Sequence, residues 1–222
     1  MMTNLFSIFD PATPNLISNW SSMFMFLLFM PTILWSNNNR WLSLNNHLIK
    51  YIMTEFKPLI NKSTFSLSLS MILFMLIMYN NVLGMVPYIF TASSHMVFTL
   101  SLALPLWLAL MLYGWLNNYS SLLIHLIPQG TPVILMPFMV IIELISALIR
   151  PLTLAIRLAA NMIAGHLLMV LLSSSFLTLP AISFIILTPS LVLLSLLEIA
   201  VAFIQAYVFS VLITLYLAES IS

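Results

Sequence analysis

Two long apolar segments near the end of the chain carry charged side chains that such segments rarely hold. Glu143, Arg150 and Arg157 lie in the first segment, and Glu198 lies in the second. A charge at the centre of a bilayer costs about 2.5–3.5 kcal/mol on insertion scales, so a charged residue there is by default a candidate functional residue. Two alternatives stay open. Glu143 and Arg150 also fit helix ends whose side chains reach the interface, and Arg157 and Glu198 also fit a structural ion pair.

The spacing of the polar residues places them on one face of each helix. In the first segment they recur at steps of three and four, which is the periodicity of a helix face: Glu143, Ser146, Arg150, Thr153, Arg157 and Asn161. A milder stripe follows in the second segment: Ser195, Glu198, Ala202 and Gln205. Such a stripe is also typical of a helix-packing seam. The two arginines argue against a simple packing seam, because arginine keeps its charge and needs water or an anionic partner.

His166 is expected to work together with Glu198. Histidine titrates near neutral pH, and a buried glutamate beside it would exchange protons with it, although a lone histidine is also often structural. Facing residues of an antiparallel hairpin have numbers with a nearly constant sum. A turn centred near Ala181 sets His166 opposite Glu198 and Arg157 opposite Gln205, which is the register that we favour. A turn one helical turn earlier would set Arg157 beside Glu198.

The elements that position these residues must be membrane helices. Only 11 of 222 residues are charged and 62% are hydrophobic, whereas a soluble domain carries about 25% charged residues. The charge-free runs between Asp10 and Arg40, Lys62 and Glu143, and Arg157 and Glu198 do not alternate as β-barrel strands do. A net charge of +1 argues against nucleic acid as a partner, and the absence of cysteine excludes disulfides.

We therefore expect an all-α, polytopic membrane protein with about five transmembrane helices plus one interfacial amphipathic helix, the last two spans forming a long hairpin. The single membrane domain, 1–222, divides into an irregular lead at 1–19, a first span at 20–35, an interfacial segment at 36–64, a helical hairpin and loop at 65–137, and the long hairpin at 138–217. Within these parts the later spans are placed at 65–86, 96–116, 138–172 and 181–217, and a proline-rich loop at 122–137.

The interfacial segment also sets the expected orientation. It holds four of the six basic residues: Arg40, Lys50, Lys57 and Lys62. Basic loops face the cytoplasm or matrix, so the N-terminus is expected on the opposite side together with His95, a candidate vestibule residue. Apolar residues recur in the segment at helical spacing, as expected for a helix that lies in the interface: Leu44, Leu48, Tyr51 and Ile52.

The last two segments are longer than a bilayer requires. Thirty-five helical residues extend roughly 52 Å, against a hydrocarbon core of about 30 Å. Each segment is therefore expected either to break in two, with Pro151 as one possible break, or to lie steeply tilted.

Three stretches of the sequence resemble a known family. They read PQGTPVILMPFMVIIELIS (Pro128–Ser146), RPLTLAIRLAANMIAGHLL (Arg150–Leu168) and LEIAVAFIQAYVF (Leu197–Phe209). Over essentially its whole length the chain is similar to subunit a (subunit 6) of the F-type ATP synthase, in its mitochondrially encoded form. The motif R-L-x-x-N-x-x-A-G-H is highly specific for that family.

The resemblance implies a role for each matching position. Arg157 matches the essential arginine that faces a rotor ring of c subunits. The half-channel toward the intermembrane space would hold His166, Glu198 and Gln205. Glu143 and Asn161 match positions of the half-channel toward the matrix.

The resemblance also implies the setting of the protein. Its partners would be the c ring, the peripheral-stalk subunit b, other Fo subunits and inner-membrane lipid. The N-terminus would face the intermembrane space and the C-terminus the matrix. Ser146, Arg150 and His95 are kept as accessory candidates.

Other function classes remain in view. A secondary transporter or a proton-pumping respiratory-chain subunit would also bury arginine, glutamate and histidine, but such proteins usually have more spans and often internal repeats. A membrane scaffold would use the same charges as structural pairs. The sequence has no GxxxxGK[ST] or GxGxxG motif and no pattern of metal ligands. We therefore expect no nucleotide site, metal or cofactor, and no enzyme activity of the chain on its own.

Overall fold

The computed structural model describes residues 5–12, 18–30, 39–59, 64–117, 119–125, 127, 132–176 and 184–221. The elements in these ranges are all helical, which confirms the all-α fold class. They are the 3-10 turns η1 (Leu5–Phe9) and η2 (Asn19–Phe24), α1 (Phe26–Phe29), α2 (Arg40–Phe56), α3 (Thr64–Gly84), the turn η3 (Ala92–Ser94), α4 (Met96–Asn117), α5 (Tyr119–His125), the turn η4 (Val133–Leu135), α6 (Met136–Ser175) and α7 (Phe184–Ile221).

Four of the described helices are long and apolar enough to cross a membrane, which confirms a polytopic membrane protein: α3, α4, α6 and α7. The first span predicted at 20–35 lies partly outside the described residues. Its described part forms η2 and the single turn α1, so the total of about five spans stays a prediction.

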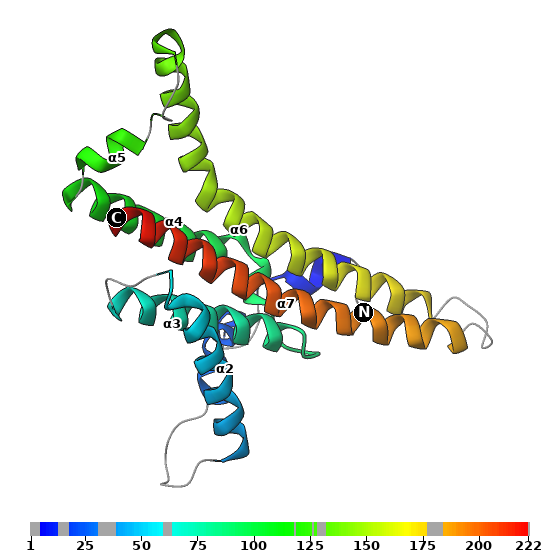
Figure 1. Ribbon diagram of the computed structural model, residues 1–222. Helices are drawn as coiled ribbons and strands as arrows, with labels where there is room; N and C mark the ends of the chain where they lie inside the picture. Colours follow the sequence, from blue (N-terminus) through cyan, green and yellow to red (C-terminus); the bar gives the residue numbers. More distant parts are fainter. Residues whose placement is uncertain are drawn as a thin grey trace.

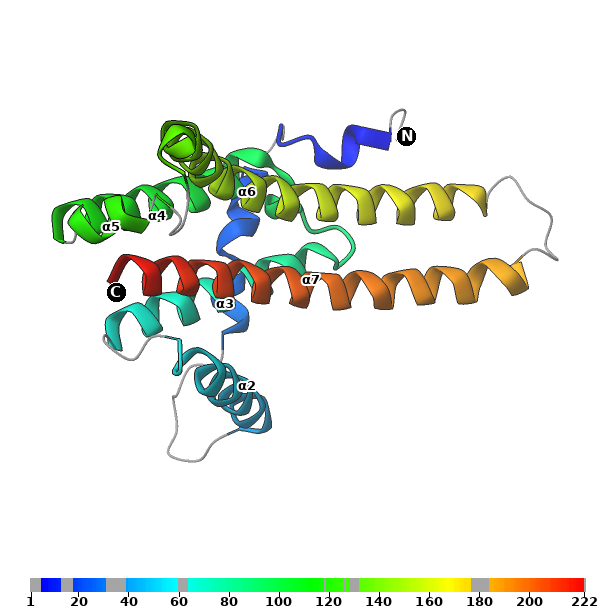
Figure 2. The ribbon, with the colours of Figure 1, turned by 45° about the horizontal axis from the view of Figure 1, so that its top comes forward.

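The long helices pack side by side with α7 in the middle. α3 runs along one side of α7, whereas α6 and α4 run along the other side (Figures 1 and 2). In lipid, such helices are held by close packing rather than by expulsion of water. Small buried residues allow this close approach: Ala155, Ala159, Ala202 and Ala206 are at most 1% exposed.

α6 and α7 form the predicted long hairpin. Figure 1 shows them side by side over the yellow end of α6 and the orange start of α7, and diverging toward the start of α6 and the end of α7. The helices have 40 and 38 residues, or roughly 60 and 57 Å of length. Both are twice as long as the hydrocarbon core is thick, so they lie tilted in a bilayer or extend beyond it.

Pro151 bends α6 without breaking it. The helix is continuous from Met136 to Ser175, and Figure 1 shows its bend in the yellow-green part, around residue 150. Proline has no N–H to donate and its ring clashes with the carbonyl one turn earlier, which bends a helix at that point. The alternative that each long segment breaks in two is therefore wrong.

α2 confirms the predicted helix in the interfacial segment and presents two different faces. Ile52 and Phe56 are buried, and the Phe56 ring stacks on the Tyr207 ring of α7 with centroids 6.2 Å apart. Toward α3, the Tyr79 hydroxyl donates a hydrogen bond of 3.3 Å to Asn45 Oδ1. Leu44 and Tyr51 are 53% and 66% exposed on another face. The predicted grouping of these residues is wrong for Ile52, because one residue turns a helix by about 100°.

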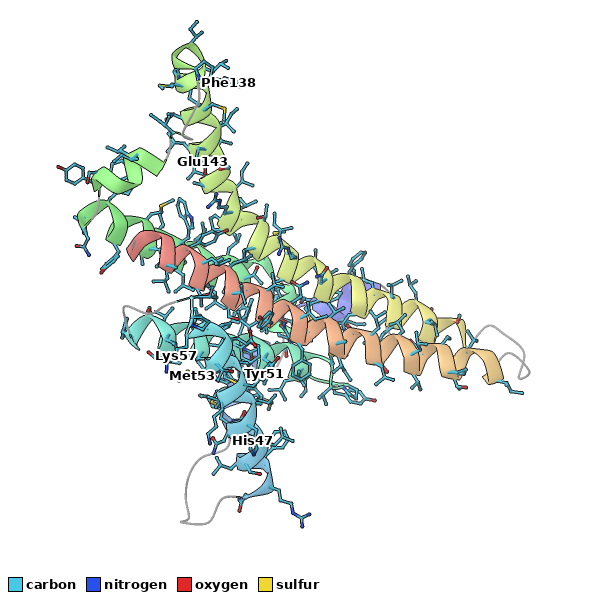
Figure 3. The ribbon with its side chains drawn as sticks, in the orientation of Figure 1. His47, Tyr51, Met53, Lys57, Phe138 and Glu143 are labelled. Carbon is cyan, nitrogen blue, oxygen red and sulfur yellow. The ribbon has the colours of Figure 1, made fainter. Side chains whose placement is uncertain are left out.

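The connection between α4 and α6 differs in part from the predicted loop. The polar residues that follow Asn117 begin α5, a helix of seven residues, and the chain enters α6 through the turn η4. Between α3 and α4 the chain reverses at Tyr88, whose φ of 69° lies in the left-handed region. Figure 3 shows the resulting spread of the molecule, with His47 on α2 and Phe138 on α6 at opposite ends of the view.

Candidate functional site

His166 of α6 and Glu198 of α7 face each other across the long hairpin. His166 Nε2 lies 3.9 Å from Glu198 Oε1, and the two side chains are 12% and 5% exposed. This contact confirms the register predicted for the pair. The alternative register, with Arg157 beside Glu198, is wrong, because Arg157 lies more than two helical turns before His166 on α6.

Gly165 makes room for the Glu198 carboxyl group. A Cβ atom at position 165 would lie 2.5 Å from Glu198 Oε1 and 2.8 Å from its Cδ, which is closer than non-bonded atoms approach. Glu198 therefore lies directly against the backbone of α6, and the glycine that precedes His166 in the motif is a steric requirement of the pair.

The two ionisable groups lie in a site that their own chain does not fully satisfy. Among the described residues, His166 Nε2 and both carboxylate oxygens of Glu198 are buried and have no hydrogen-bond partner. The Phe9 ring of η1 covers His166 edge-on, with the ring centroids 6.3 Å apart. Buried ionisable groups cost free energy unless they are paired or hydrated, so an incompletely paired cluster inside a membrane span indicates function.

Arg157 lies on the outer side of α6. Its side chain is exposed, and no hydrogen bond or ion pair to it occurs within the described part of the chain. Ala160 and Ala164, at helical spacing from Arg157, are also exposed and leave the surface beside the guanidinium shallow. Because an arginine is always charged, it needs water or an anion beside it in a membrane span. The arrangement fits an anionic group brought by another molecule.

The side chains of Asn161 and Gln205 are neither fully buried nor fully exposed. Asn161 is half-buried one turn after Arg157, and Gln205 is half-buried about two turns after Glu198 on α7. The predicted approach of Gln205 to Arg157 stays a prediction.

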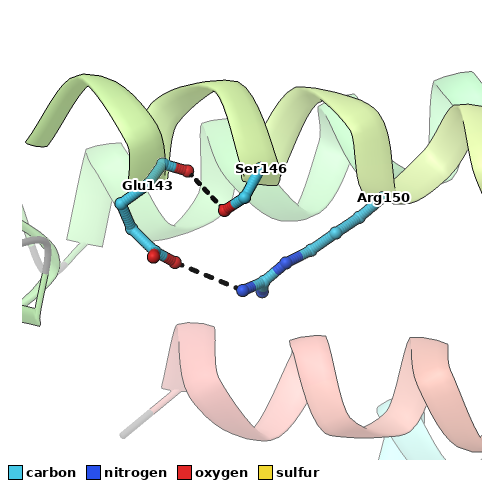
Figure 4. Close-up of polar contacts among 3 residues, drawn as sticks. All are labelled: Glu143, Ser146 and Arg150. Carbon is cyan, nitrogen blue, oxygen red and sulfur yellow. Dashed lines mark hydrogen bonds and ion pairs between the residues drawn. The ribbon is translucent and has the colours of Figure 1, made fainter. Parts of the chain in front are cut away.

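Glu143, Ser146 and Arg150 form a second polar group near the start of α6, shown in Figure 4. Arg150 Nη2 donates to Glu143 Oε1 at 3.2 Å across two helical turns, and the Ser146 hydroxyl donates to the Glu143 carbonyl at 2.8 Å. The Arg150 guanidinium also lies over the Tyr216 ring of α7, 5.4 Å from its centroid. The Arg150 and Glu143 side chains are 36% and 42% exposed, so water reaches this group. The sequence predicted that these three residues share one helix face, but not the ion pair between them.

His95 lies before α4 and forms a three-ring cluster with Trp20 and Phe90, whose own ring centroids are 5.8 Å apart. The corresponding distances from His95 are 5.3 Å and 5.0 Å, and the Phe90 ring stacks on the imidazole. Its Nε2 is buried without a hydrogen-bond partner in the described ranges. The sequence identified this residue as a loop histidine but not its aromatic surroundings.

Two buried amides of α3 were missed by sequence reasoning. Asn80 and Asn81 are 7% and 0% exposed, and Asn81 Nδ2 donates a long hydrogen bond of 3.5 Å to the Ala202 carbonyl of α7. The signal in the sequence is an asparagine doublet inside an apolar span that carries no charged residue.

These features define a class of protein: a polytopic helical membrane protein that holds ionisable side chains inside its spans. Among the described residues no group of three or more side chains is arranged to ligate a metal. The model of the family described as ATP synthase A chain matches residues 16–218.

Relatives from insects extend this match to the whole chain. The chain is 53% identical to ATP synthase subunit a of Drosophila simulans, and likewise 53% identical to that of Anopheles quadrimaculatus. It is 50% identical to ATP synthase subunit a of Locusta migratoria, and in all three comparisons 99% of both chains is covered. The chain belongs to the ATP synthase A chain family.

Proposed function

We propose that this chain is the proton-conducting stator subunit of the Fo sector of an ATP synthase in the mitochondrial inner membrane. The family match and the identity of 50–53% to insect subunits a support this function. The chain makes no ATP by itself. It couples the flow of protons across the membrane to the rotation of a ring of c subunits.

The observation that carries the proposal is Arg157, which is exposed on the surface of α6 and has no hydrogen bond or ion pair among the described residues. A carboxylate on a passing c subunit would supply the missing anion. The fixed positive charge of Arg157 favours the ionised carboxylate and repels a proton, so protons cannot pass directly from one side of the arginine to the other. The exposed Ala160 and Ala164 would let the ring approach closely.

The two polar groups of α6 fit an entry and an exit. His166 lies 23 residues after Glu143, which is roughly 35 Å measured along the helix and about the thickness of the hydrocarbon core. Arg157 lies between them, roughly 13 Å from His166 and 21 Å from Glu143 on the same measure. Two half-channels that end on either side of Arg157 would be offset along the ring.

In the proposed cycle, a proton enters from the intermembrane space past His166, Glu198 and Gln205 and neutralises a c-subunit carboxylate. A neutral carboxyl group crosses lipid at far lower cost than an ionised one, so the ring turns. After nearly a full turn the carboxyl group meets the polar group of Glu143 and Asn161 and loses its proton to the matrix. Each proton crossing supplies about 2.3 kcal/mol per 100 mV of membrane potential.

The orientation and remaining partners follow from the same proposal. Arg40, Lys50 and Lys57 are exposed on or beside α2, as expected for a segment on the matrix side. The N-terminus would then face the intermembrane space and the C-terminus the matrix. The c ring, subunit b of the peripheral stalk, other Fo subunits and lipid would cover the exposed apolar surface.

The test is substitution of Arg157 in the assembled ATP synthase. Arg157→Ala is expected to assemble with the ring and to abolish coupled ATP synthesis, because the barrier between the half-channels is lost. Arg40→Ala, which removes an arginine from the exposed start of α2, is the matched control and should support normal synthesis. Normal synthesis by Arg157→Ala would overturn the proposal. Loss of assembly in that variant alone would instead indicate a scaffold.

A further inference from the structure

The two sides of the bend in α6 differ in how well they are packed. From Met136 to Arg150, all of which are described, no side chain is buried, and Figure 1 shows this part of α6 leading away from α7. Glu143 lies in the middle of this poorly packed part. Its position therefore does not follow from close packing within the subunit. After the bend, six side chains of α6 are buried: Pro151, Leu154, Ala155, Leu158, Ala159 and Met162.

A neighbouring rotor would not fix Glu143 either. In the proposed function, the polar group of Glu143 meets a ring of c subunits that moves past it. A surface that slides cannot hold a side chain in one position for successive protons. Proton transfer requires the donor and the acceptor to lie within hydrogen-bond reach of each other, directly or through one water. A carboxylate that accepts protons from a moving ring therefore needs an anchor in the stator itself.

Arg150 supplies such an anchor, because it contacts Glu143 and α7 at the same time. Its Nη2 donates to Glu143 Oε1 at 3.2 Å, and its guanidinium carbon lies 5.4 Å from the centroid of the Tyr216 ring. Figure 4 shows the side chains of Glu143 and Arg150 on the side of α6 toward α7. A helical side chain tilts toward the N-terminus of its helix, so Arg150 reaches back to Glu143 while it stays over the ring. The guanidinium thus joins the exit carboxylate to the last turns of α7.

Tyr216 lies in the well-packed part of the molecule. Its neighbours on α7, Ile213 and Leu217, are 4% and 8% exposed. The Tyr216 ring also lines a small apolar cavity together with Trp107 of α4 and Pro151 of α6. A cation is attracted to the face of an aromatic ring, and the attraction is stronger where water is excluded. The guanidinium of Arg150 therefore has a defined seat on α7.

We propose that Tyr216 and Arg150 are positioning residues of the proton exit: the Tyr216 ring fixes the Arg150 guanidinium, which in turn fixes the Glu143 carboxylate beside the passing ring. Arg150 exchanges no proton itself, because arginine stays charged. This inference rests on the proposed function and deepens it. α7 then serves both half-channels, with Glu198 and Gln205 at the entry and Tyr216 at the exit.

The first experiment changes Tyr216 in the assembled ATP synthase and measures proton flux through Fo per assembled complex. Tyr216→Phe should conduct within about twofold of the normal flux, because a phenylalanine ring also attracts a cation. Tyr216→Leu keeps an apolar side chain but removes the ring, so the flux should fall about threefold as the proton acceptor loses its position. Tyr113→Leu, at a half-exposed tyrosine of α4, is the matched control and leaves the flux unchanged.

Two outcomes of this experiment would overturn the proposal. Normal flux per complex in Tyr216→Leu, with a lowered melting temperature, would show that the ring only packs the helices together. An equal fall of the flux in Tyr216→Phe and Tyr216→Leu would assign the effect to the hydroxyl group instead of the ring face.

The second experiment acts on Arg150 and does not depend on the assembly of Tyr216→Leu. The Arg150 side chain is 36% exposed, so its replacement leaves the packed core intact. Arg150→Gln should lower the flux about fivefold, because the carboxylate loses its anchor. Arg150→Lys keeps a cation between the two partners and should recover about half of the normal flux. Equal flux in Arg150→Lys and Arg150→Gln would overturn the proposal.

The double variant tests whether Tyr216 acts through Arg150. In Arg150→Gln the contact with the ring is already lost, so adding Tyr216→Leu should cause no further fall of the flux. Independent effects that multiply in the double variant would refute the chain of contacts from Tyr216 through Arg150 to Glu143.

Failure of this inference is distinguishable from failure of the proposed function. If Arg157→Ala abolishes coupled synthesis while Tyr216→Leu and Arg150→Gln conduct normally, the stator function stands and only the anchor of Glu143 is refuted. If Arg157→Ala synthesises ATP normally, the stator function itself is wrong.

Discussion

Gly165→Ala tests how closely the pair depends on its geometry. The added methyl carbon would lie 2.5 Å from Glu198 Oε1, 2.8 Å from Cδ and 3.1 Å from Cγ. Ordinary contact between such atoms begins near 3.5 Å, so the carboxylate oxygen must move by roughly 1 Å. Glu198 is buried between α6 and α7, so this movement must displace neighbouring side chains or lengthen the contact with His166.

The expected effect on stability is small. Adding volume to a packed site costs about 1–3 kcal/mol, whereas alanine stabilises a helix interior by about 0.8–1.0 kcal/mol relative to glycine. The net destabilisation is about 0–2 kcal/mol, which leaves the subunit folded and assembled. The effect on proton transfer is larger, because a displacement of 1 Å in a reacting group lowers a rate by about 10²-fold. We expect ATP-driven proton pumping to fall by about 10- to 100-fold.

The assay is proton pumping by the reconstituted complex, normalised to the amount of assembled subunit. Gly84→Ala adds the same methyl group against Thr91 at 3.2 Å and should pump at near the normal rate. Glu198→Asp withdraws the carboxylate by one methylene, so combining it with Gly165→Ala should recover part of the loss, with a favourable coupling in the double-mutant cycle. Normal pumping by Gly165→Ala, or strict additivity of the two changes, would refute the steric argument.

Three further predictions concern other contacts. Glu143→Gln should lower proton flux more than Arg150→Gln. Both changes remove the same partly exposed ion pair, worth about 0–1 kcal/mol, but only Glu143→Gln removes a proton acceptor. Equal proton flux in the two variants would show that Glu143 has only a structural role. Tyr79→Phe removes the buried donor to Asn45 and should cost about 0.5–1.5 kcal/mol, lowering the melting temperature of the purified complex without changing its proton flux. Pro151→Ala supplies the missing N–H and should straighten α6. Distances between spin labels at the start of α6 and at the end of α7 would detect the change. Unchanged distances would show that helix packing imposes the bend.

The long hairpin could be predicted from the sequence because its signals were local and strong. The segments expected at 138–172 and 181–217 are α6 and α7, within a few residues at each end. The contact between His166 and Glu198 followed from the position of the turn, since an antiparallel pair fixes every facing residue once one is known. Neither inference needed the rest of the molecule.

Features that depend on tertiary packing could not be predicted in the same way. Periodicity places Glu143 and Arg150 on one face of α6, but it does not bring Tyr216 of α7 against the Arg150 guanidinium. α5 begins within a run of polar residues that usually closes a helix. The sequence alone gave no role to Asn80 and Asn81; both are buried, and Asn81 donates a hydrogen bond to the Ala202 carbonyl of α7.

The central place of α7 has a consequence for how the protein is made. About two thirds of the α3 span is buried within the subunit, and α7, its main neighbour, is the last helix to be synthesised. Roughly 100 residues separate the end of α3 from the start of α7, so at 5–20 residues per second the nascent α3 waits about 5–20 s for its neighbour. During that time its serines and asparagines face lipid or an insertion factor. A translational stall or truncation before α7 would therefore leave a polar-faced orphan helix in the membrane, which quality-control proteases would recognise.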